Sequence, residues 1–431
     1  MHSQILLSSL ILISALAPSP AAAQDSGPLF DDEGLPRIIV GPAEHRRDKI
    51  AVADIKCLGD KSKCEQINRQ LRRNLEISTF FEVLNSKTYV ANKESETLVN
   101  TKWPDWFNVG ARYLIKGRLS GKGPYDIELR FYNVLEKQEV KIKGQTSLAV
   151  PSSRVRKVVN NFINGIVGKL TGKRGIFGSH IVYAAKTTAT TRGIAMVEMD
   201  GHGRRGIAGG GTINQFPHFA PGGILFTSWR DGKPELWVGK KKITHDAWQY
   251  RGASYSSNGR LAASLTKGSG SDIYILGSGG KIQSRVTHGQ GQNVSPTWSP
   301  DGSKLAFVSD RAGGPQVFIT NVGGGGAKRL TMAGSYNSTP HWGVNNLIVF
   351  AGMTASGSDI FTVDLSGNIN RITQDQGTNL DPCWSPDGRY LAFVAIRKGK
   401  GKRIWISSAD GRWQFPISKK SGSYSTLRWG P

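Results

Sequence analysis

Six polar or aromatic residues recur along the second half of the chain at an almost constant interval. The series, with spacings of 36, 43, 44, 42 and 45 residues, is Asn214, Tyr250, Asn293, Asn337, Asn379 and Tyr424. Amide and phenol groups donate and accept hydrogen bonds, and several of them on one surface suit recognition of a protein partner. We therefore expect a partner-binding site here, with Arg251 as a further member. Asn and Gly also fit tight turns, so a purely structural role stays open.

The three cysteines indicate one local crosslink and no disulfide scaffold. Cys57 and Cys64 enclose six residues, and in an oxidising compartment we expect them to form a disulfide that fixes a turn between a strand and a helix. Cys383 directly precedes Trp384 and is expected to be a buried free thiol.

The usual signatures of catalysis and of cofactor binding are missing from the sequence. It contains no G-x-S-x-G, G-x-x-x-x-G-K-[ST], H-E-x-x-H or C-x-x-C motif. Residues 201–206 match G-x-G-x-x-G, but no helical pattern follows, and the segment fits a hairpin. The 8 histidines lack the spacing of metal ligands. We therefore expect no catalytic, cofactor-binding or metal-binding residues; a propeller enzyme, either peptidase-like or a metal-dependent hydrolase, is the alternative.

The N-terminus has the composition of an export signal. Residues 5–17 form an apolar run of 13, too short to span a membrane, and residues 21–23 fit the A-x-A cleavage pattern. We expect residues 1–23 to be a signal peptide, although its first residues contain neither Lys nor Arg. Residues 24–36 are polar and contain Gly and Pro, so we expect a flexible arm.

A change in glycine content predicts a domain boundary near Gly172. The first 171 residues hold 11 glycines and the last 260 hold 42. Residues 37–174 are expected to form a small α/β domain, with a final helix that begins after Ser152 or Ser153 and ends at Gly172. Its strands are predicted at 50–55, 80–84, 112–118, 127–132 and 139–143, and its helices at 64–75 and 152–170.

Residues 175–431 contain a repeat of about 43 residues, which two independent series define. The aromatic anchors are Phe219, Tyr255, Trp298, Trp342, Trp384 and Trp429, and an aliphatic series with the same spacings is Ile207, Ile243, Val286, Leu330, Ile372 and Ile417. Each unit reads as four strands, which in the unit of Trp298 are 295–298, 304–309, 316–322 and 328–331. The repeat predicts a six-bladed β-propeller. Strands 181–185, 194–198 and 204–208 should join the C-terminal strand and close the circle.

The net charge of +24 is spread over both domains, as +9 in residues 24–175 and +15 beyond them. Basic runs such as 397–403 fall at predicted hairpin turns, where solvated charge is the simplest interpretation. A diffuse surplus without an RNA-binding motif favours an acidic envelope surface over nucleic acid as the partner.

The order of a leader, a small α/β domain and a propeller with Trp-Ser-Pro-Asp-Gly turns resembles the TolB family of the Tol–Pal system. The pentapeptide occurs at Trp298 and again at Trp384. Further family-like segments are Leu71-Arg-Arg73, Phe80-Phe-Glu-Val-Leu84, the stretch from Trp106 to Arg118, Leu129 to Val134, and Lys169 to Gly172 ahead of Ile181. The resemblance covers essentially the whole chain after the leader.

The resemblance implies a non-enzymatic, monomeric adaptor of the periplasm. In that family the propeller binds the lipoprotein Pal at the mouth of its channel, and the start of the mature chain binds TolA. Carried over to this sequence, the six recurring residues and Arg251 would face Pal, and Gln24, Asp25, Leu29 and Phe30 would belong to the TolA-binding arm. Other envelope proteins and colicins are further implied partners, and the membrane is reached only through partners. The strong basicity, the Cys57/Cys64 pair and the altered turns after Tyr255 and Trp342 depart from the family pattern.

Overall fold

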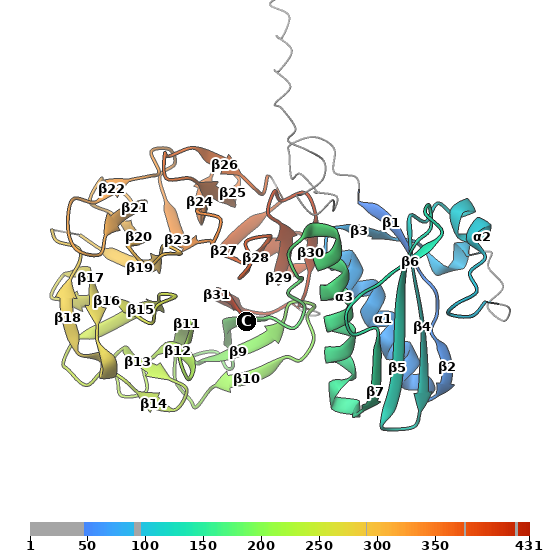
Figure 1. Cartoon of the computed structure of the whole chain (residues 1–431). Coiled ribbons are helices and arrows are strands. Elements are labelled where there is room, and N and C mark those ends of the chain that lie inside the picture. Colours follow the sequence, from blue (N-terminus) through green and yellow to red (C-terminus); the bar gives the residue numbers. More distant parts are fainter. Residues whose placement is uncertain (1–46, 90–95, 290, 375, 419–420) are drawn as a thin grey trace, which may run out of the picture.

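The computed structural model describes residues 47–89, 96–289, 291–374, 376–418 and 421–431 (Figure 1). The expected signal peptide and the arm with Gln24, Asp25, Leu29 and Phe30 lie outside the described residues. Within these residues, an α/β domain stands beside a six-bladed propeller. No helix of the described part is long and apolar enough to cross a membrane.

The α/β domain is a seven-stranded sheet with two long helices. The strands are β1 (Asp48–Val52), β2 (Lys56–Gly59), β3 (Phe81–Val83), β4 (Tyr113–Gly121), β5 (Tyr125–Asn133), β6 (Gln138–Val140) and β7 (Thr146–Val150). The helices are α1 (Lys61–Ile77), α2 (Trp103–Asn108) and α3 (Val155–Thr171), with 3-10 turns at Ser86–Thr88 and Ser152–Arg154. The main path runs β3-β1-β4-β5-β6, while β2 pairs with β4 and β7 with β5. All five predicted strands and both predicted helices are present; β2, β7 and α2 are additional.

The ends of α3 test the predicted capping residues. Its N-cap is Arg154, which makes no side-chain capping bond, so the predicted cap at Ser152 or Ser153 is wrong. Those two serines lie in a 3-10 turn that precedes the helix. At the other end Gly172 has a φ of 70°, a left-handed conformation that glycine adopts readily, and it ends the helix as predicted.

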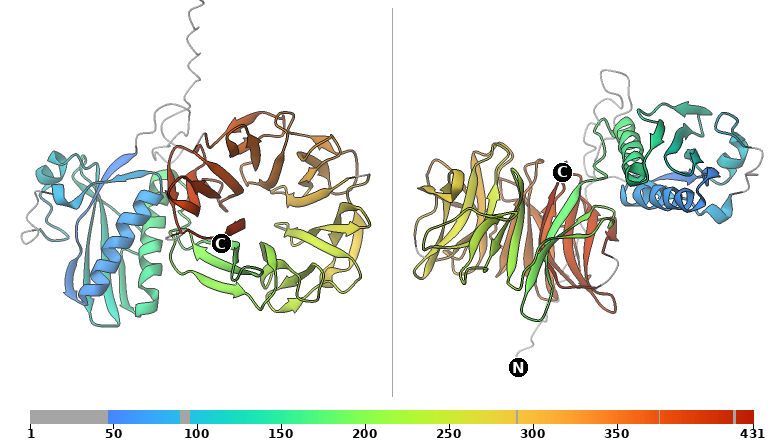
Figure 2. Two further views of the ribbon diagram at one scale, coloured as in Figure 1. Left: turned by 180° about the vertical axis from the view of Figure 1, so that it is seen from behind. Right: turned by 90° about the horizontal axis from the view of Figure 1, so that it is seen from below.

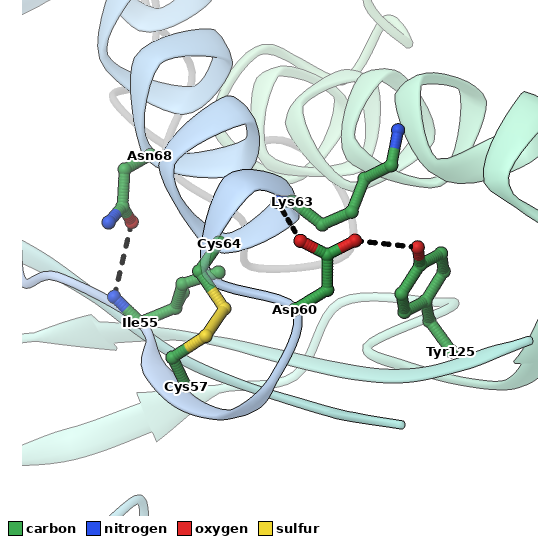
Figure 3. Close-up of a disulfide and its surroundings, with 7 residues drawn as sticks. All are labelled: Ile55, Cys57, Asp60, Lys63, Cys64, Asn68 and Tyr125. Atoms are coloured by element: carbon green, nitrogen blue, oxygen red, sulfur yellow. Dashed lines mark hydrogen bonds between the residues drawn. A yellow bond between two sulfur atoms is a disulfide. The ribbon is translucent and has the colours of Figure 1, made fainter. Parts of the chain in front are cut away.

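The predicted disulfide between Cys57 and Cys64 is confirmed, and it joins β2 to the first turn of α1 (Figure 3). Asp60 lies inside the loop and is the N-cap of α1, where its carboxylate accepts a hydrogen bond from Lys63 N at 3.2 Å. The Tyr125 hydroxyl donates to the same carboxylate at 2.9 Å. The crosslink and the cap therefore fix the same strand-to-helix turn. Cys383 is a buried free thiol, as predicted.

The propeller consists of six four-stranded sheets in which the chain usually runs from the innermost strand outward. Blade 2 is β11 (Asn214–Ala220), β12 (Gly223–Ser228), β13 (Glu235–Val238) and β14 (Lys241–Lys242); blade 3 is β15 (Gln249–Tyr255), β16 (Leu261–Lys267), β17 (Gly270–Leu276) and β18 (Ile282–Arg285). Blade 4 is β19 (Asn293–Trp298), β20 (Lys304–Ser309), β21 (Gln316–Asn321) and β22 (Lys328–Arg329); blade 5 is β23 (Asn337–Trp342), β24 (Ile348–Thr354), β25 (Gly357–Val363) and β26 (Ile369–Arg371). Blade 6 is β27 (Thr378–Trp384), β28 (Tyr390–Arg397), β29 (Gly401–Ser408) and β30 (Gln414–Pro416), and a short 3-10 turn occupies Ser278–Gly280.

Blade 1 closes the circle with both ends of the propeller sequence, as predicted. Its order is β10-β9-β8-β31, where β8 (His180–Lys186), β9 (Arg192–Glu198) and β10 (Arg205–Ala208) come first in the chain and β31 (Tyr424–Gly430) comes last. The innermost strands of neighbouring blades contact one another all the way around, including β31 with β11 and β27. We propose the domain boundary between α3 and β8, at residues 172–179.

The Ser-Pro-Asp-Gly turns connect the first and second strands of blades 4 and 6. In blade 4 Ser299 donates to Asp301 at 2.6 Å, and Asp301 accepts the Ser303 N–H at 3.0 Å. These bonds lower the pKa of Asp301, and Gly302 has a φ of 69°. We call this end of the propeller the turn end. The opposite end, where the innermost strands begin, is the ring end.

The α/β domain is attached at the turn end. Arg389, in the turn of blade 6, donates to Lys173 O at 3.0 Å and Arg174 O at 2.6 Å. Tyr390 donates to Ser78 O at 2.9 Å, and both parts of the chain contribute to one buried apolar cluster. Figure 2 shows the domain displaced from the edge-on propeller toward one side, beside blades 1 and 6. The ring end stays uncovered by the described part of that domain.

Candidate functional site

The six recurring residues begin or nearly begin the innermost strands, so the structure brings them together in one circle at the ring end. We call them the Asn/Tyr ring: Asn214, Tyr250, Asn293, Asn337, Asn379 and Tyr424. None of their side chains is exposed, and the largest exposed fraction is 3 %. The sequence therefore predicted their arrangement but not their burial.

The asparagines of blades 4, 5 and 6 fasten each blade to the one before it. In blade 6 Asn379 donates to Asp359 of blade 5 at 2.9 Å, and Thr373 donates to the same Asp359 oxygen at 2.6 Å. Arg371 completes the group with an ion pair to Asp359 at 2.5 Å. Such a buried network is stabilising because every polar group in it finds a partner. We call this arrangement the blade clasp.

The blade clasp is repeated with small changes around the propeller. Between blades 3 and 4 it is made by Asp272, Arg285, Thr287 and Asn293, and between blades 4 and 5 by Gln316, Thr331 and Asn337. The threonine is the residue that follows the aliphatic series in the sequence. It also accepts a backbone N–H at 2.9 Å, as Thr373 does from Ile360. The sequence contained this signal, a Thr one position after four of the six aliphatic residues, but its hydrogen-bonding role was not predicted.

The expectation that these side chains form an accessible surface is therefore wrong for six of the seven residues. Tyr250 donates to Asp246 at 2.6 Å, Asn214 donates to Arg192 O at 3.1 Å, and Tyr424 stacks edge-on with Tyr183. A docked partner could not touch them without opening the blades. Arg251 is exposed and is the one side chain of these seven that is available to a partner.

A second circle of residues lies two positions further along each innermost strand. Its members all have positive φ, between 51° and 81°: Phe216, Gly252, Ser295, Thr339, Asp381 and Thr426. Each falls in a register shift between the innermost strand and its neighbour. We call this the bulge ring. Positive φ is unfavourable for a side chain with Cβ, and only Gly252 avoids that cost. Sequence reasoning missed this ring because its residue types do not repeat.

The bulge ring lines the axial channel of the propeller. A cavity of about 40 Å³ is bounded by all six of its members together with Pro217, Ala253, Pro296 and Arg428. The hydroxyl oxygens of Thr339 and Thr426 have no hydrogen-bond partner among the described residues. Strained backbone and unused polar groups together are typical of a binding site rather than of a packed core.

Charges near the channel are poorly solvated. Burial and the neighbouring Arg428 lower the pKa of His218 to about 4 and lower that of His341 further below its ordinary value. His341 accepts the backbone N–H of Trp384 at its Nδ1 atom, 3.0 Å away, a bond that needs the neutral ring. Burial also raises the pKa of Asp381 and lowers that of Arg428. These groups favour a channel of low net charge over one that holds free ions.

The ring end also carries exposed apolar side chains. Met332 and Tyr336, in the connection between blades 4 and 5, are 69 % and 46 % exposed. Met353 is 55 % exposed, and its N–H donates to Tyr336 O at 2.9 Å, so the two lie side by side. Ile396 of blade 6 is 40 % exposed. We call Met332, Tyr336, Met353 and Ile396 the apolar rim. Apolar side chains of this size at the mouth of a channel are typical of protein interfaces.

The described residues contain no group of three or more His, Cys, Asp or Glu placed to hold a metal ion. The segment 201–206, which matches the dinucleotide motif, connects β9 to β10 as a hairpin and opens no helix. These positions therefore give no support to cofactor chemistry.

Two family models match the chain in the order of its domains. The TolB amino-terminal domain matches residues 36–140, and the TolB beta propeller domain matches residues 167–431. Together they include nearly all of the described structure.

Individual relatives give the same result over almost the full length. The Tol-Pal system protein TolB of Anaeromyxobacter dehalogenans is 35 % identical over 97 % of this chain and 96 % of its own, and that of Bordetella pertussis is 26 % identical over 98 % and 94 %. The crystal structure of TolB from Acinetobacter baumannii aligns with a TM-score of 0.76 at 23 % identity, covering 90 % of this chain and 97 % of its own. That structure supports the fold.

Proposed function

The chain belongs to the TolB family, and from this premise we propose that it is a non-enzymatic adaptor of the Tol-Pal system in the periplasm. It binds Pal with its propeller and TolA with residues 24–36. By linking these partners it supports outer-membrane integrity and the invagination of the outer membrane during cell division, and colicins use it for import. The observation that carries the proposal is the match of both TolB domains in order, together with 35 % identity to a TolB protein over 97 % of the chain.

We assign the Pal contact to the ring end of the propeller. The α/β domain occupies the turn end, where Arg389 and Tyr390 bind it, so the ring end is the mouth that a partner can reach. The apolar rim supplies exposed apolar area there, and Arg251 supplies an exposed charge beside the channel. Central apolar anchors with charged neighbours are the usual composition of a protein-binding hot spot.

The bulge ring extends this surface into the channel. Its positive-φ residues place the hydroxyls of Thr339 and Thr426 where the described residues offer no hydrogen-bond partner. The cavity beside these hydroxyls is about 40 Å³, so a small polar group, such as the tip of one Pal side chain, would satisfy them. The Asn/Tyr ring then acts indirectly, because the blade clasp keeps the neighbouring bulges in place.

The proposal is tested by affinity capture from an envelope extract with two proteins, the full chain and a chain that lacks residues 24–36. Recovery of Pal by both proteins, and of TolA by the full chain alone, is the expected pattern. The deletion leaves the described residues intact, so recovery of Pal by the shortened chain also serves as the control for its folding. Recovery of neither partner by the full chain would overturn the proposal.

A further inference from the structure

A second cavity lies on the outer flank of blade 6, away from the channel. It has a volume of about 550 Å³, and its wall is formed by β29, β30 and neighbouring connections together with Arg47, which precedes β1. The lining residues that matter here are Arg47, Arg397, Lys398, Lys400, Trp405 and Trp413. Among the described residues, no Asp or Glu lines it. The proposed adaptor function makes no use of this cavity.

Arg397 is the cation that most needs a partner. Its guanidinium donates to Asn379 Oδ1 at 2.8 Å and to the amide oxygens of Gln376 and Gln414, each at 3.4 Å. These acceptors are neutral, and the described residues give Arg397 no carboxylate within ion-pair distance. Partial burial lowers the pKa of Arg397. The more distant Asp359 raises it, but by less than burial lowers it. A half-buried charge of this kind is usually balanced by an anion, which the protein itself does not supply here.

Lys398 and Lys400 extend the positive charge to the rim of the cavity. Both side chains are exposed, and neither has an ion pair among the described residues. Arg47 differs because Glu76 pairs with it at 2.6 Å, so its charge is already balanced. The uncompensated charge of the cavity therefore comes from Arg397, Lys398 and Lys400. A concave surface with charges of one sign concentrates ligands of the opposite sign.

Two indole rings give the same cavity an apolar wall. Trp405 lies under Arg397, whose Cζ atom is 5.2 Å from the ring centroid, and Trp413 lies under Arg47 at 4.2 Å. Both tryptophans are partly exposed. An indole offers a flat apolar surface, while a neighbouring guanidinium binds carboxylate or phosphate in a fixed geometry. The ligand that matches both features has a ring with an apolar face and a negative group attached to it.

We propose that this cavity of blade 6 binds an anionic saccharide, a sugar ring that carries a carboxylate or a phosphate. Its negative group is bound by Arg397, Lys398 and Lys400, and its ring lies against Trp405 and Trp413. Arg397 follows Ile396 of the apolar rim and donates to Asn379 of the Asn/Tyr ring, so the site borders the ring end on the outer side of blade 6. The basic run 397–403 would then contribute to a ligand-binding site, in addition to carrying the solvated charge expected at a hairpin turn.

The test is calorimetric titration of the full chain with four probes at low salt. The probes are N-acetylmuramic acid, which carries a carboxylate, glucosamine 6-phosphate, N-acetylglucosamine as the neutral sugar, and inorganic phosphate. At least one of the two anionic sugars should bind with a dissociation constant at least about tenfold lower than those of N-acetylglucosamine and phosphate. The tighter of the two identifies the source of the negative charge. Equal affinity for the neutral sugar, or for phosphate alone, would overturn the proposal.

Variants place the ligand in this cavity. The double substitution Lys398→Gln/Lys400→Gln changes only exposed side chains, so it should fold normally and weaken binding of the anionic sugar by about threefold to tenfold. Arg397→Gln should weaken it by at least tenfold. Lys240→Gln, an exposed position on blade 2, removes one positive charge as Arg397→Gln does, and this control should leave the affinity unchanged. An unchanged affinity in both cavity variants would contradict the proposal even if Pal binding is intact.

Discussion

The Asn/Tyr ring and the bulge ring lie two residues apart on the same six strands, yet they differ in every other respect. The first consists of asparagines and tyrosines, all of them buried, and its four asparagines donate hydrogen bonds to the preceding blade. The second has no common residue type, has positive φ and lines the channel. A residue type that recurs from blade to blade in this propeller thus indicates a contact that joins neighbouring blades. The surface that a partner meets is free to vary from blade to blade.

Among the substitutions that test this comparison, we expect the largest change in the free energy of unfolding from the loss of a blade clasp. Asp359→Ala removes the acceptor shared by Arg371, Thr373 and Asn379 and leaves three donors in a mostly buried site. We expect the free energy of unfolding to fall by about 3 kcal/mol, measured by urea denaturation. Glu65→Ala, which removes an exposed ion pair with Arg69, is the matched control and should change it by less than about 0.5 kcal/mol. Equal effects of the two substitutions would show that the clasp carries no special stability.

The histidines near the channel should make the stability of the propeller depend on pH. The folded pKa of His218 is about 4, below its unfolded value of 6.5, and that of His341 is lowered as well. The unfolded state therefore binds more protons between these values. The stabilising contribution is complete above the unfolded pKa and declines as the pH falls toward the folded pKa. We expect a loss of about 1 to 3 kcal/mol between pH 7 and pH 4 that is specific to these histidines.

His218→Gln provides the comparison for this titration. Its free energy of unfolding should fall less steeply with pH than that of the unchanged protein, because one of the neutral rings has been replaced by an amide that does not titrate. Identical pH profiles for the two proteins would mean that His218 is protonated in the folded state at its ordinary pKa.

In the bulge ring we expect a smaller change in the free energy of unfolding, and one that stabilises the protein. Thr339 has a φ of 52°, which is unfavourable for a β-branched residue, and glycine at this position removes that strain. Thr339→Gly should raise the free energy of unfolding by up to about 1 kcal/mol, the strain relief being partly offset by the greater freedom of the unfolded chain. The same variant should bind Pal more weakly, since the hydroxyl is lost. A more stable protein with unchanged Pal affinity would remove Thr339 from the proposed interface.

The smallest effect on stability is expected at Arg251, the exposed member of the predicted set. Arg251→Ala should change the free energy of unfolding by no more than about 0.5 kcal/mol. It should nevertheless weaken Pal binding several-fold, because a charge beside the channel mouth is lost. Thermal unfolding and calorimetry on the same sample separate the two quantities. A large loss of stability would place Arg251 with the Asn/Tyr ring rather than with the exposed surface.

The sequence predicted the propeller, its blade number and its closure because these depend on local patterns that repeat six times. Aliphatic and aromatic positions and turn residues recur at fixed offsets, and their periodicity survives the change of any single residue, as at Tyr255 and Trp342. The strand β2, which is short and contains Lys56 and Gly59, has no such repeat to support it. The N-cap of α3 failed for a similar reason, since two adjacent serines suggested a cap and the chain formed a 3-10 turn instead.

The sequence predicted the position of the Asn/Tyr ring, but it predicted neither the burial of that ring nor the bulge ring and the apolar rim. Spacing placed the Asn/Tyr ring at one end of the channel, but burial depends on the preceding blade, whose acceptors such as Asp359 lie about 20 residues earlier in the chain. The bulge ring is a backbone feature, and Phe216, Ser295, Thr339, Asp381 and Thr426 share no side-chain property that a sequence pattern could report. The apolar rim depends on Met332 and Met353, which tertiary structure alone brings to the same end.

The measurement that tests the central proposal most directly is the affinity of purified Pal for two matched double variants. Met332→Ser/Met353→Ser removes exposed apolar side chains at the ring end, and Val344→Ser/Leu365→Ser removes side chains of 52 % and 38 % exposure at the turn end. All four positions are exposed, so both proteins should fold with nearly unchanged stability. We expect the first variant to bind Pal at least about tenfold more weakly and the second to bind it like the unchanged chain. Loss of affinity in the turn-end variant alone, or in neither variant, would contradict the assignment of Pal to the ring end.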